Sequence, residues 1–117
     1  MGLPPRAAVI ALATAQQESE LLNLNWGDRD SLGLFQQRPS MGWGTPSQVR
    51  DPEYAARKFF RALQDVDGWE KLPLTVAAQK VQRSAFPWAY ARWELMAAKV
   101  VQDQLDDVSP RELGCAR

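Results

Sequence analysis

The chain has 117 residues, enough for one domain with a buried core, and 45% of them are hydrophobic, which is a globular composition. Its 14 basic and 14 acidic residues cancel, so we expect no nucleic-acid partner, because no basic field attracts phosphates. The absence of histidine excludes a Ser-His-Asp triad, a Cys-His dyad and a histidine-ligated zinc, so acid–base chemistry must use carboxylates, Lys, Tyr or Cys115.

Helix signals begin close to the N-terminus. Two prolines followed by small alanines predict a first helix from about Pro5 to Leu22. A polar loop over 23–30 follows, and a short helix is then predicted from Ser31 to Gln37. Residues 41–46 contain two glycines and a proline, which is typical of a turn-rich loop.

Two helices are predicted in the middle of the chain. Asp51-Pro52 supplies a capping side chain and a first-turn proline for a helix that ends near Asp67-Gly68. Thr75 can cap the next helix, which continues to about Gln82.

The last predicted helix begins near Pro87. Its proposed inner face has helical spacing and consists of Ala91, Leu95, Ala98, Val101, Gln102 and Leu105. No segment alternates as a strand, so the sequence predicts one all-α domain over 1–117. The loops at 23–30 and 38–45 are long enough to carry a site.

Membrane and export signals are not found in the sequence. No run of 18 apolar residues exists, and no basic segment precedes a hydrophobic stretch as in a signal peptide. Because residues 1–5 lead almost directly into a helix, we expect the chain to be cut from a longer protein. Cys115 has no second cysteine to pair with, so it is either an inert thiol or half of a disulfide to a cysteine outside this sequence.

Glu18 stands out because it is expected on the apolar face of the first helix, which it shares with Ala15 and Leu22. Desolvation and the negative end of the helix dipole both favour a protonated acid there, and such an acid can donate a proton to a leaving oxygen. The alternative is an exposed glutamate, or one that pairs with Arg29 or Arg38.

Several motifs, in order, resemble one enzyme family. Glu18-Ser19, a polar loop and Gly33-Leu34-Phe35-Gln36 are similar to signatures of soluble-type lytic transglycosylases and goose-type lysozymes. Asp51-Pro52 before a helix falls where that family has a further motif. Ser84-Ala85-Phe86-Pro87, with Tyr90, stands where the family has Asn-Ala-Gly-Pro, so the sequence departs from the family motif at this place. Three stretches look more closely like a lysozyme-like domain of exported actinobacterial proteins: residues 16–19, 27–39 and 81–84.

The resemblance implies a compact lysozyme-like helical domain with a glycan-binding cleft. It implies cleavage of the β-1,4 bond between N-acetylmuramic acid and N-acetylglucosamine in peptidoglycan, outside the cell or in its envelope. Glu18 would protonate the glycosidic oxygen, the substrate's N-acetyl group would stabilise the cation, and the Glu18 carboxylate would deprotonate the C6 hydroxyl to close a 1,6-anhydro ring. No metal or cofactor is required. Peptidoglycan strands are the expected partner, and a monomer is the expected state.

The resemblance also implies supporting residues. Ser19 would orient Glu18, or it simply bonds a helix carbonyl. Tyr90 would lie near the catalytic acid, or it belongs to the core. Phe35 is as much a core candidate as a groove candidate. Polar groups that would line the sugar groove are Ser31, Gln36, Gln82 and Ser84.

Three tryptophans lie in or beside loops, where an indole face can stack on a sugar ring: Trp26, Trp43 and Trp88. They can equally be hydrophobic plugs under those loops. Because the closer resemblance is to exported domains, we expect Cys115 to form a disulfide with a cysteine upstream of this sequence.

Asp28 and Asp30 are the only candidates for a second catalytic carboxylate. A carboxylate roughly 6.5–9.5 Å from Glu18 would favour hydrolysis with inversion by a muramidase. The structural alternative is an ion-pairing turn and a cap for the helix expected from Ser31. A third possibility, from a different class, is a lysozyme-like domain without catalysis that binds glycan or spaces an envelope assembly.

Overall fold

Five α-helices and three short 3-10 helices form the part of the chain that the structure describes, residues 2–84 and 86–104 of a computed structural model. The all-α class predicted from the sequence is confirmed, and the described residues contain one strand-like pairing, a bridge between Leu32 and Gln37. None of the described helices combines the length and apolar character that crossing a membrane requires. In chain order the α-helices are α1 (Pro5–Ser19), α2 (Pro46–Val49), α3 (Pro52–Gln64), α4 (Leu74–Gln82) and α5 (Glu94–Gln104).

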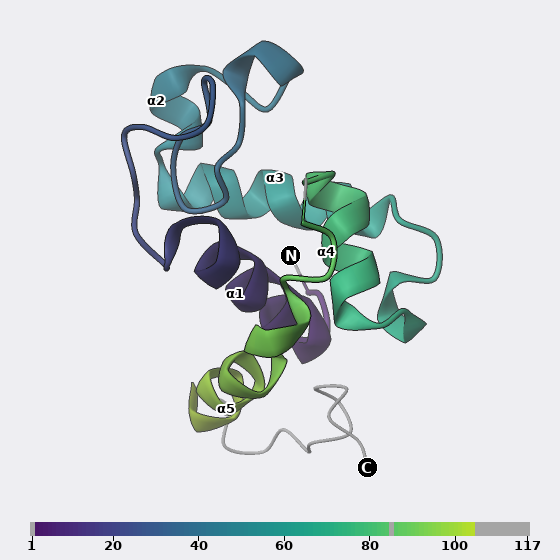
Figure 1. Ribbon diagram of the computed structural model, residues 1–117. Helices are drawn as coiled ribbons and strands as arrows, with labels where there is room; N and C mark the ends of the chain where they lie inside the picture. The colour runs from purple at the N-terminus through teal and green to yellow at the C-terminus, as the bar shows by residue number, and fades with distance from the viewer. Residues whose placement is uncertain (1, 85, 105–117) are drawn as a thin grey trace.

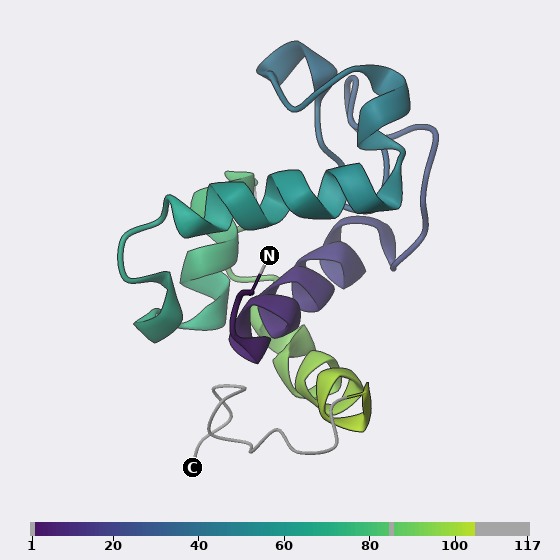
Figure 2. The same ribbon diagram turned by 180° about the vertical axis from the view of Figure 1, so that it is seen from behind.

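Helix α1 occupies the middle of the fold and contacts α3, α4 and α5 (Figures 1 and 2). Val9, Ile10 and Ala13 on α1 are fully buried, as are Phe59 of α3 and other large side chains of the neighbouring helices. Burying one such large apolar side chain contributes about 2 kcal/mol, so packing, more than helix propensity, holds α1 in place.

Helix α1 ends at Ser19, three residues before the predicted end at Leu22. Glu20 and Leu21 adopt left-handed backbone conformations, with φ of 58° and 63°. The amide of Glu20 donates to the carbonyls of Ala15 and Gln16, which closes the helix. The prediction was wrong because the usual signal for this ending is a glycine, and none is present here. Leu22, placed on the apolar face by the longer helix, is 55% exposed.

Replacing Glu20 by glycine is expected to stabilise the protein by about 1 kcal/mol, because a left-handed conformation strains any residue with a Cβ. The free energy of unfolding in urea measures this gain. Glu20→Ala is the matched control, since it removes the same carboxylate but keeps the Cβ. Equal gains from the two variants would show that charge, not backbone strain, is responsible.

The segment from Ser31 to Gln37 is a tight turn and not the predicted helix. The amide of each bridge residue, Leu32 and Gln37, donates to the other's carbonyl at 3.0 Å. Gly33 and Gln36 have φ of 82° and 52°, which reverses the chain between them. A Cβ on Gly33 would lie 2.3 Å from the Val49 carbonyl oxygen, so this glycine is required for the close approach.

The turn is anchored on α3. The Phe35 ring stacks on Phe59 with centroids 4.8 Å apart, and the buried Gln37 side chain donates to the Ala55 carbonyl at 3.1 Å. Phe35 is therefore a core residue, one of the two alternatives that the sequence left open. The loop after it contains the short helix α2, which was not predicted.

The middle helices are largely as predicted. Asp51 caps α3 by accepting a hydrogen bond from the Glu53 amide at 3.0 Å, but the helix ends at Gln64, earlier than Asp67-Gly68. Thr75 lies inside α4 and not at its cap. Its hydroxyl donates to the Pro87 carbonyl, which fastens the segment after α4 to that helix.

Helix α5 begins at Glu94, not near Pro87, and is preceded by a 3-10 turn over Ala91–Trp93. Ala98 and Val101 of the predicted inner face are buried, whereas Leu95 is 79% exposed. The face assignment was wrong at Leu95 because the buried face of α5 is formed by Ala97, Ala98 and Val101, and Leu95 lies about 200° around the helix from Ala97. Leu105 and Cys115 lie outside the described residues.

Candidate functional site

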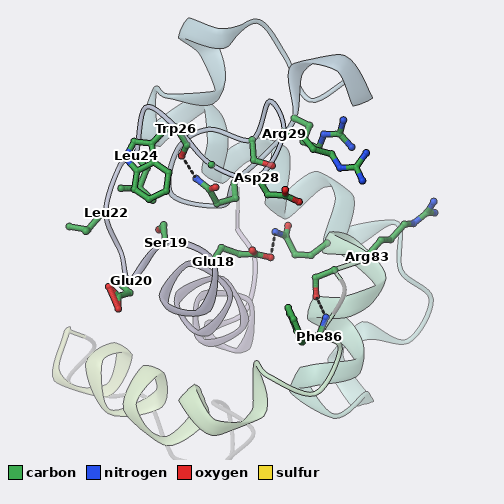
Figure 3. A pocket seen from close by; sticks show the side chains of 16 residues that line it. Glu18, Ser19, Glu20, Leu22, Leu24, Trp26, Asp28, Arg29, Arg83 and Phe86 are labelled. Atoms are coloured by element: carbon green, nitrogen blue, oxygen red, sulfur yellow. Dashed lines mark hydrogen bonds between the residues drawn. The ribbon is translucent and has the colours of Figure 1, made fainter.

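An open pocket of about 700 Å³ lies at the C-terminal end of α1, between the loop that follows it and the end of α4 (Figure 3). Glu18 and Ser19 of α1 form part of its wall. The remaining lining residues come from the two other segments: Glu20, Leu22, Leu24, Trp26, Gly27, Asp28, Arg29, Ser31, Gln36, Arg38, Gln82, Arg83, Ser84 and Phe86.

Glu18 is half-buried, and one of its two carboxylate oxygens is held from both sides. Oε2 accepts a hydrogen bond from the Tyr90 hydroxyl at 2.8 Å and another from Nε2 of Gln82 at 2.9 Å. Oε1 has no partner among the described residues. A proton carried by this carboxyl group would therefore sit on Oε1, since Oε2 already accepts two hydrogen bonds.

Tyr90 combines the two roles that the sequence left open. Its side chain is fully buried in the core, and its hydroxyl contacts the Glu18 carboxylate. Burial first, and then the negative charge of Glu18, raises the pKa of Tyr90 far above its ordinary value. The phenol thus stays protonated at any physiological pH and acts as a permanent donor to Oε2.

Gln82 joins three segments at the site. Its Nε2 donates to Glu18 Oε2 and, at 2.8 Å, to the carbonyl of Phe35. Helix α4 is thereby tied to α1 and to the turn over Ser31–Gln37. The sequence placed Gln82 in the same cleft as Glu18, and the geometry agrees with that placement.

Ser19 is close to Glu18 in sequence but does not bond its carboxylate. Its hydroxyl lies 2.7 Å from the Leu34 carbonyl and 3.1 Å from the Ala15 carbonyl. The helix-carbonyl alternative is therefore correct. Ser19 holds the turn against α1 and lines the pocket without contacting the Glu18 carboxylate.

The other polar candidates, Ser31, Gln36 and Ser84, line the same pocket as Glu18. Ser31 is buried in its wall. The side-chain amide of Gln36 donates to the Gly33 carbonyl at 3.0 Å. Gly27 lets this side chain come close, because a Cβ there would lie 1.9 Å from Gln36 Oε1. Ser84 is held by the Gln79 side chain, with their Oγ and Oε1 atoms 3.1 Å apart.

The three loop tryptophans separate in space. Trp26 lines the pocket and is 67% exposed, so its indole face is free. Trp88 is 73% exposed but does not line the pocket. Trp43 does not line it either, because the loop after Pro39 places it in a neighbouring hollow.

The two aspartates have different surroundings. Asp28 is exposed and lines the pocket. Asp30 instead accepts a hydrogen bond from Arg38 Nε at 2.6 Å and another from the Ser40 amide at 2.9 Å. The Arg38 hydrogen bond, supported by that of Ser40, holds the pKa of Asp30 well below its usual range. Asp30 is the ion-pairing turn residue of the structural alternative, and it does not cap a helix from Ser31, because that segment is a turn.

Strained backbone is concentrated around this pocket. Glu20, Arg29, Gln36 and Arg83 have positive φ without being glycine, and all four line it. Such residues cost roughly 1–3 kcal/mol each and persist where the surrounding fold demands them, often at functional sites. The sequence did not single out Arg29 or Arg83 as pocket residues, since nothing in local residue type marks this conformation.

The described residues contain no group of three or more Asp, Glu, Cys or His side chains placed to hold a metal ion. No known protein-family model matches the chain, and no curated protein matches it significantly.

Proposed function

We propose that this protein cleaves the glycan strand of peptidoglycan at the β-1,4 bond between N-acetylmuramic acid and N-acetylglucosamine. The observation that carries the proposal is the Glu18 carboxyl group. It lies in the wall of an open pocket, with Oε2 fixed by Tyr90 and Gln82, while no described residue bonds Oε1. This is the arrangement that a positioned proton donor needs.

In the proposed reaction Glu18 passes its proton from Oε1 to the glycosidic oxygen as the bond from that oxygen to C1 of muramic acid breaks. The substrate's N-acetyl oxygen stabilises the positive charge at C1. The Glu18 carboxylate then removes the proton of the C6 hydroxyl, whose oxygen bonds to C1. The product is a 1,6-anhydro ring, and Glu18 regains its proton.

Tyr90 and Gln82 contribute when Glu18 is ionised between these steps. Both donate to Oε2, so the negative charge is stabilised by dipoles that are already in position. Trp26 offers an exposed indole face on which a sugar ring can stack. No metal or cofactor takes part.

The motif resemblance supports the same proposal from a separate direction. Glu18-Ser19 and the turn with Gly33 and Gln36, which are similar to lytic transglycosylase signatures, meet at this pocket. From this resemblance we also infer a lysozyme-like helical fold with a glycan-binding cleft, and a monomer that acts outside the cell or in its envelope.

Hydrolysis is the second candidate, and Asp28 is the observation that favours it. Its carboxylate is exposed and lines the pocket with Glu18, so it can hold a water molecule there. A muramidase of this kind would leave a reducing end. A domain that binds glycan without cutting it would leave no new ends.

Digestion of purified peptidoglycan, followed by mass spectrometry of the soluble fragments, separates these functions. We expect fragments that end in 1,6-anhydromuramic acid, each lighter by one water than the corresponding hydrolysis product. Reducing-end fragments that disappear in Asp28→Asn would establish the muramidase instead. Wall binding without any soluble fragment would contradict both enzymatic functions.

A further inference from the structure

A second hollow, of about 680 Å³, adjoins the Glu18 pocket. It lies between the C-terminal parts of α3 and α4 and the loop over 36–43. The two hollows share four lining residues: Gln36, Arg38, Gln82 and Arg83. We call the second hollow the basic trough, for the cationic residues that line it: Arg38, Lys58, Arg61, Lys80 and Arg83.

The charge of the basic trough is nearly all of one sign. Its described lining contains five cations and one carboxylate, that of Asp65. Arg38 forms an ion pair with Asp30, while the other four cations form no ion pair with any described residue. In a chain whose charges cancel overall, this gathering means that positive charge is segregated on one face. Cations held together repel one another, and an anionic ligand relieves that repulsion.

The basic trough also has an apolar strip. Met41 and Trp43 from the loop, and Ala62 and Val66 from the region of α3, line it beside the cations. Trp43 is half-buried and is one of the residues that line the hollow. Apolar surface next to separated positive charges suits a short peptide with carboxylates and aliphatic side chains better than a bare polyanion.

We propose that the basic trough binds the acidic stem peptide of the same peptidoglycan strand whose sugars occupy the Glu18 pocket. This inference rests on the proposed function. A stem peptide branches from the lactyl group of muramic acid and carries free carboxylates. Because the two hollows share lining residues, a sugar in the Glu18 pocket and the peptide attached to it in the basic trough can be bound at the same time. A free anionic polymer would bind the same cations, but it would not explain why the basic trough adjoins the Glu18 pocket.

The test compares binding of two strand preparations to protein carrying Glu18→Gln, so that no cleavage occurs. One preparation keeps its stem peptides, and the other has been stripped of them by an amidase. We expect the peptide-bearing strands to bind about tenfold more tightly, because each exposed charge contact contributes little and several act together. Reversing two trough charges, Arg61→Glu with Lys80→Glu, should bring the ratio of the two affinities close to one. Added salt should reduce the ratio in the same direction.

The control reverses two charges outside the basic trough, Arg57→Glu with Lys99→Glu, and should leave the ratio unchanged. All four positions are exposed, and circular dichroism checks that each variant folds. Equal binding of the two preparations would overturn the inference, as would a preference for a phosphate-linked wall polymer over peptide-bearing strands. Cleavage of stripped strands by the wild type reports on the proposed function separately, because stripped strands cannot use the basic trough.

Discussion

Glu18→Gln is expected to reduce peptidoglycan cleavage by about 10²–10⁴-fold, the usual contribution of a positioned general acid. The amide has nearly the shape of the carboxyl group, and its oxygen can still accept from Tyr90 and Gln82. It cannot donate an acidic proton to the glycosidic oxygen. We therefore expect the variant to fold and to bind cell walls normally, and the rate of release of soluble fragments measures the loss.

The matched control for this variant is Glu70→Gln, which makes the same chemical change at an exposed glutamate between α3 and α4. Its rate should equal that of the wild type. If Glu18→Gln kept the wild-type rate, another group would have to protonate the leaving oxygen, and Glu18 would be only a structural residue.

Phe59→Ala is expected to cost about 3–5 kcal/mol of unfolding free energy, the usual loss for a buried phenylalanine. The Phe59 side chain is fully buried and carries the Phe35 ring stacked on it. Typical domains are stable by about 5–15 kcal/mol, so this loss leaves little margin. Urea unfolding measures it. We also expect the rate of cleavage to fall, because the Phe35 carbonyl helps to hold Gln82 beside Glu18.

Phe60→Ala provides the comparison at the next position. Phe60 is half-buried and meets Phe59 only edge-on, with centroids 6.0 Å apart. We expect it to lose clearly less stability than Phe59→Ala. Equal losses would indicate that the stack of Phe35 on Phe59 is not what joins the turn to α3.

Helices with strong local signals could be predicted from the sequence. Asp51-Pro52 predicts the start of α3, because it supplies a capping side chain and a first-turn proline. The alanine-rich segment after Pro5 predicts α1. The ends were harder, because the left-handed residues that stop α1 at Ser19 are not glycines. The turn over Ser31–Gln37 was mistaken for a helix because its conformation depends on a bridge and on contact with α3, which propensity does not describe.

The candidate site was predictable in its residues but not in its geometry. Glu18 could be singled out as a carboxyl group on an apolar helix face. Its partners Gln82 and Tyr90 are 64 and 72 residues away, so only the packing of α1 against the later segments brings them to Oε2. The same packing moves Trp43 to the basic trough and turns Asp30 toward Arg38.

The most direct test of the central claim is the length distribution of uncrosslinked peptidoglycan glycan strands before and after incubation with the protein. If Glu18 cleaves the bond as proposed, the wild type will shorten the strands by whole disaccharide units, and Glu18→Gln will not. Strands that bind the wild-type protein and keep their full length would contradict the claim.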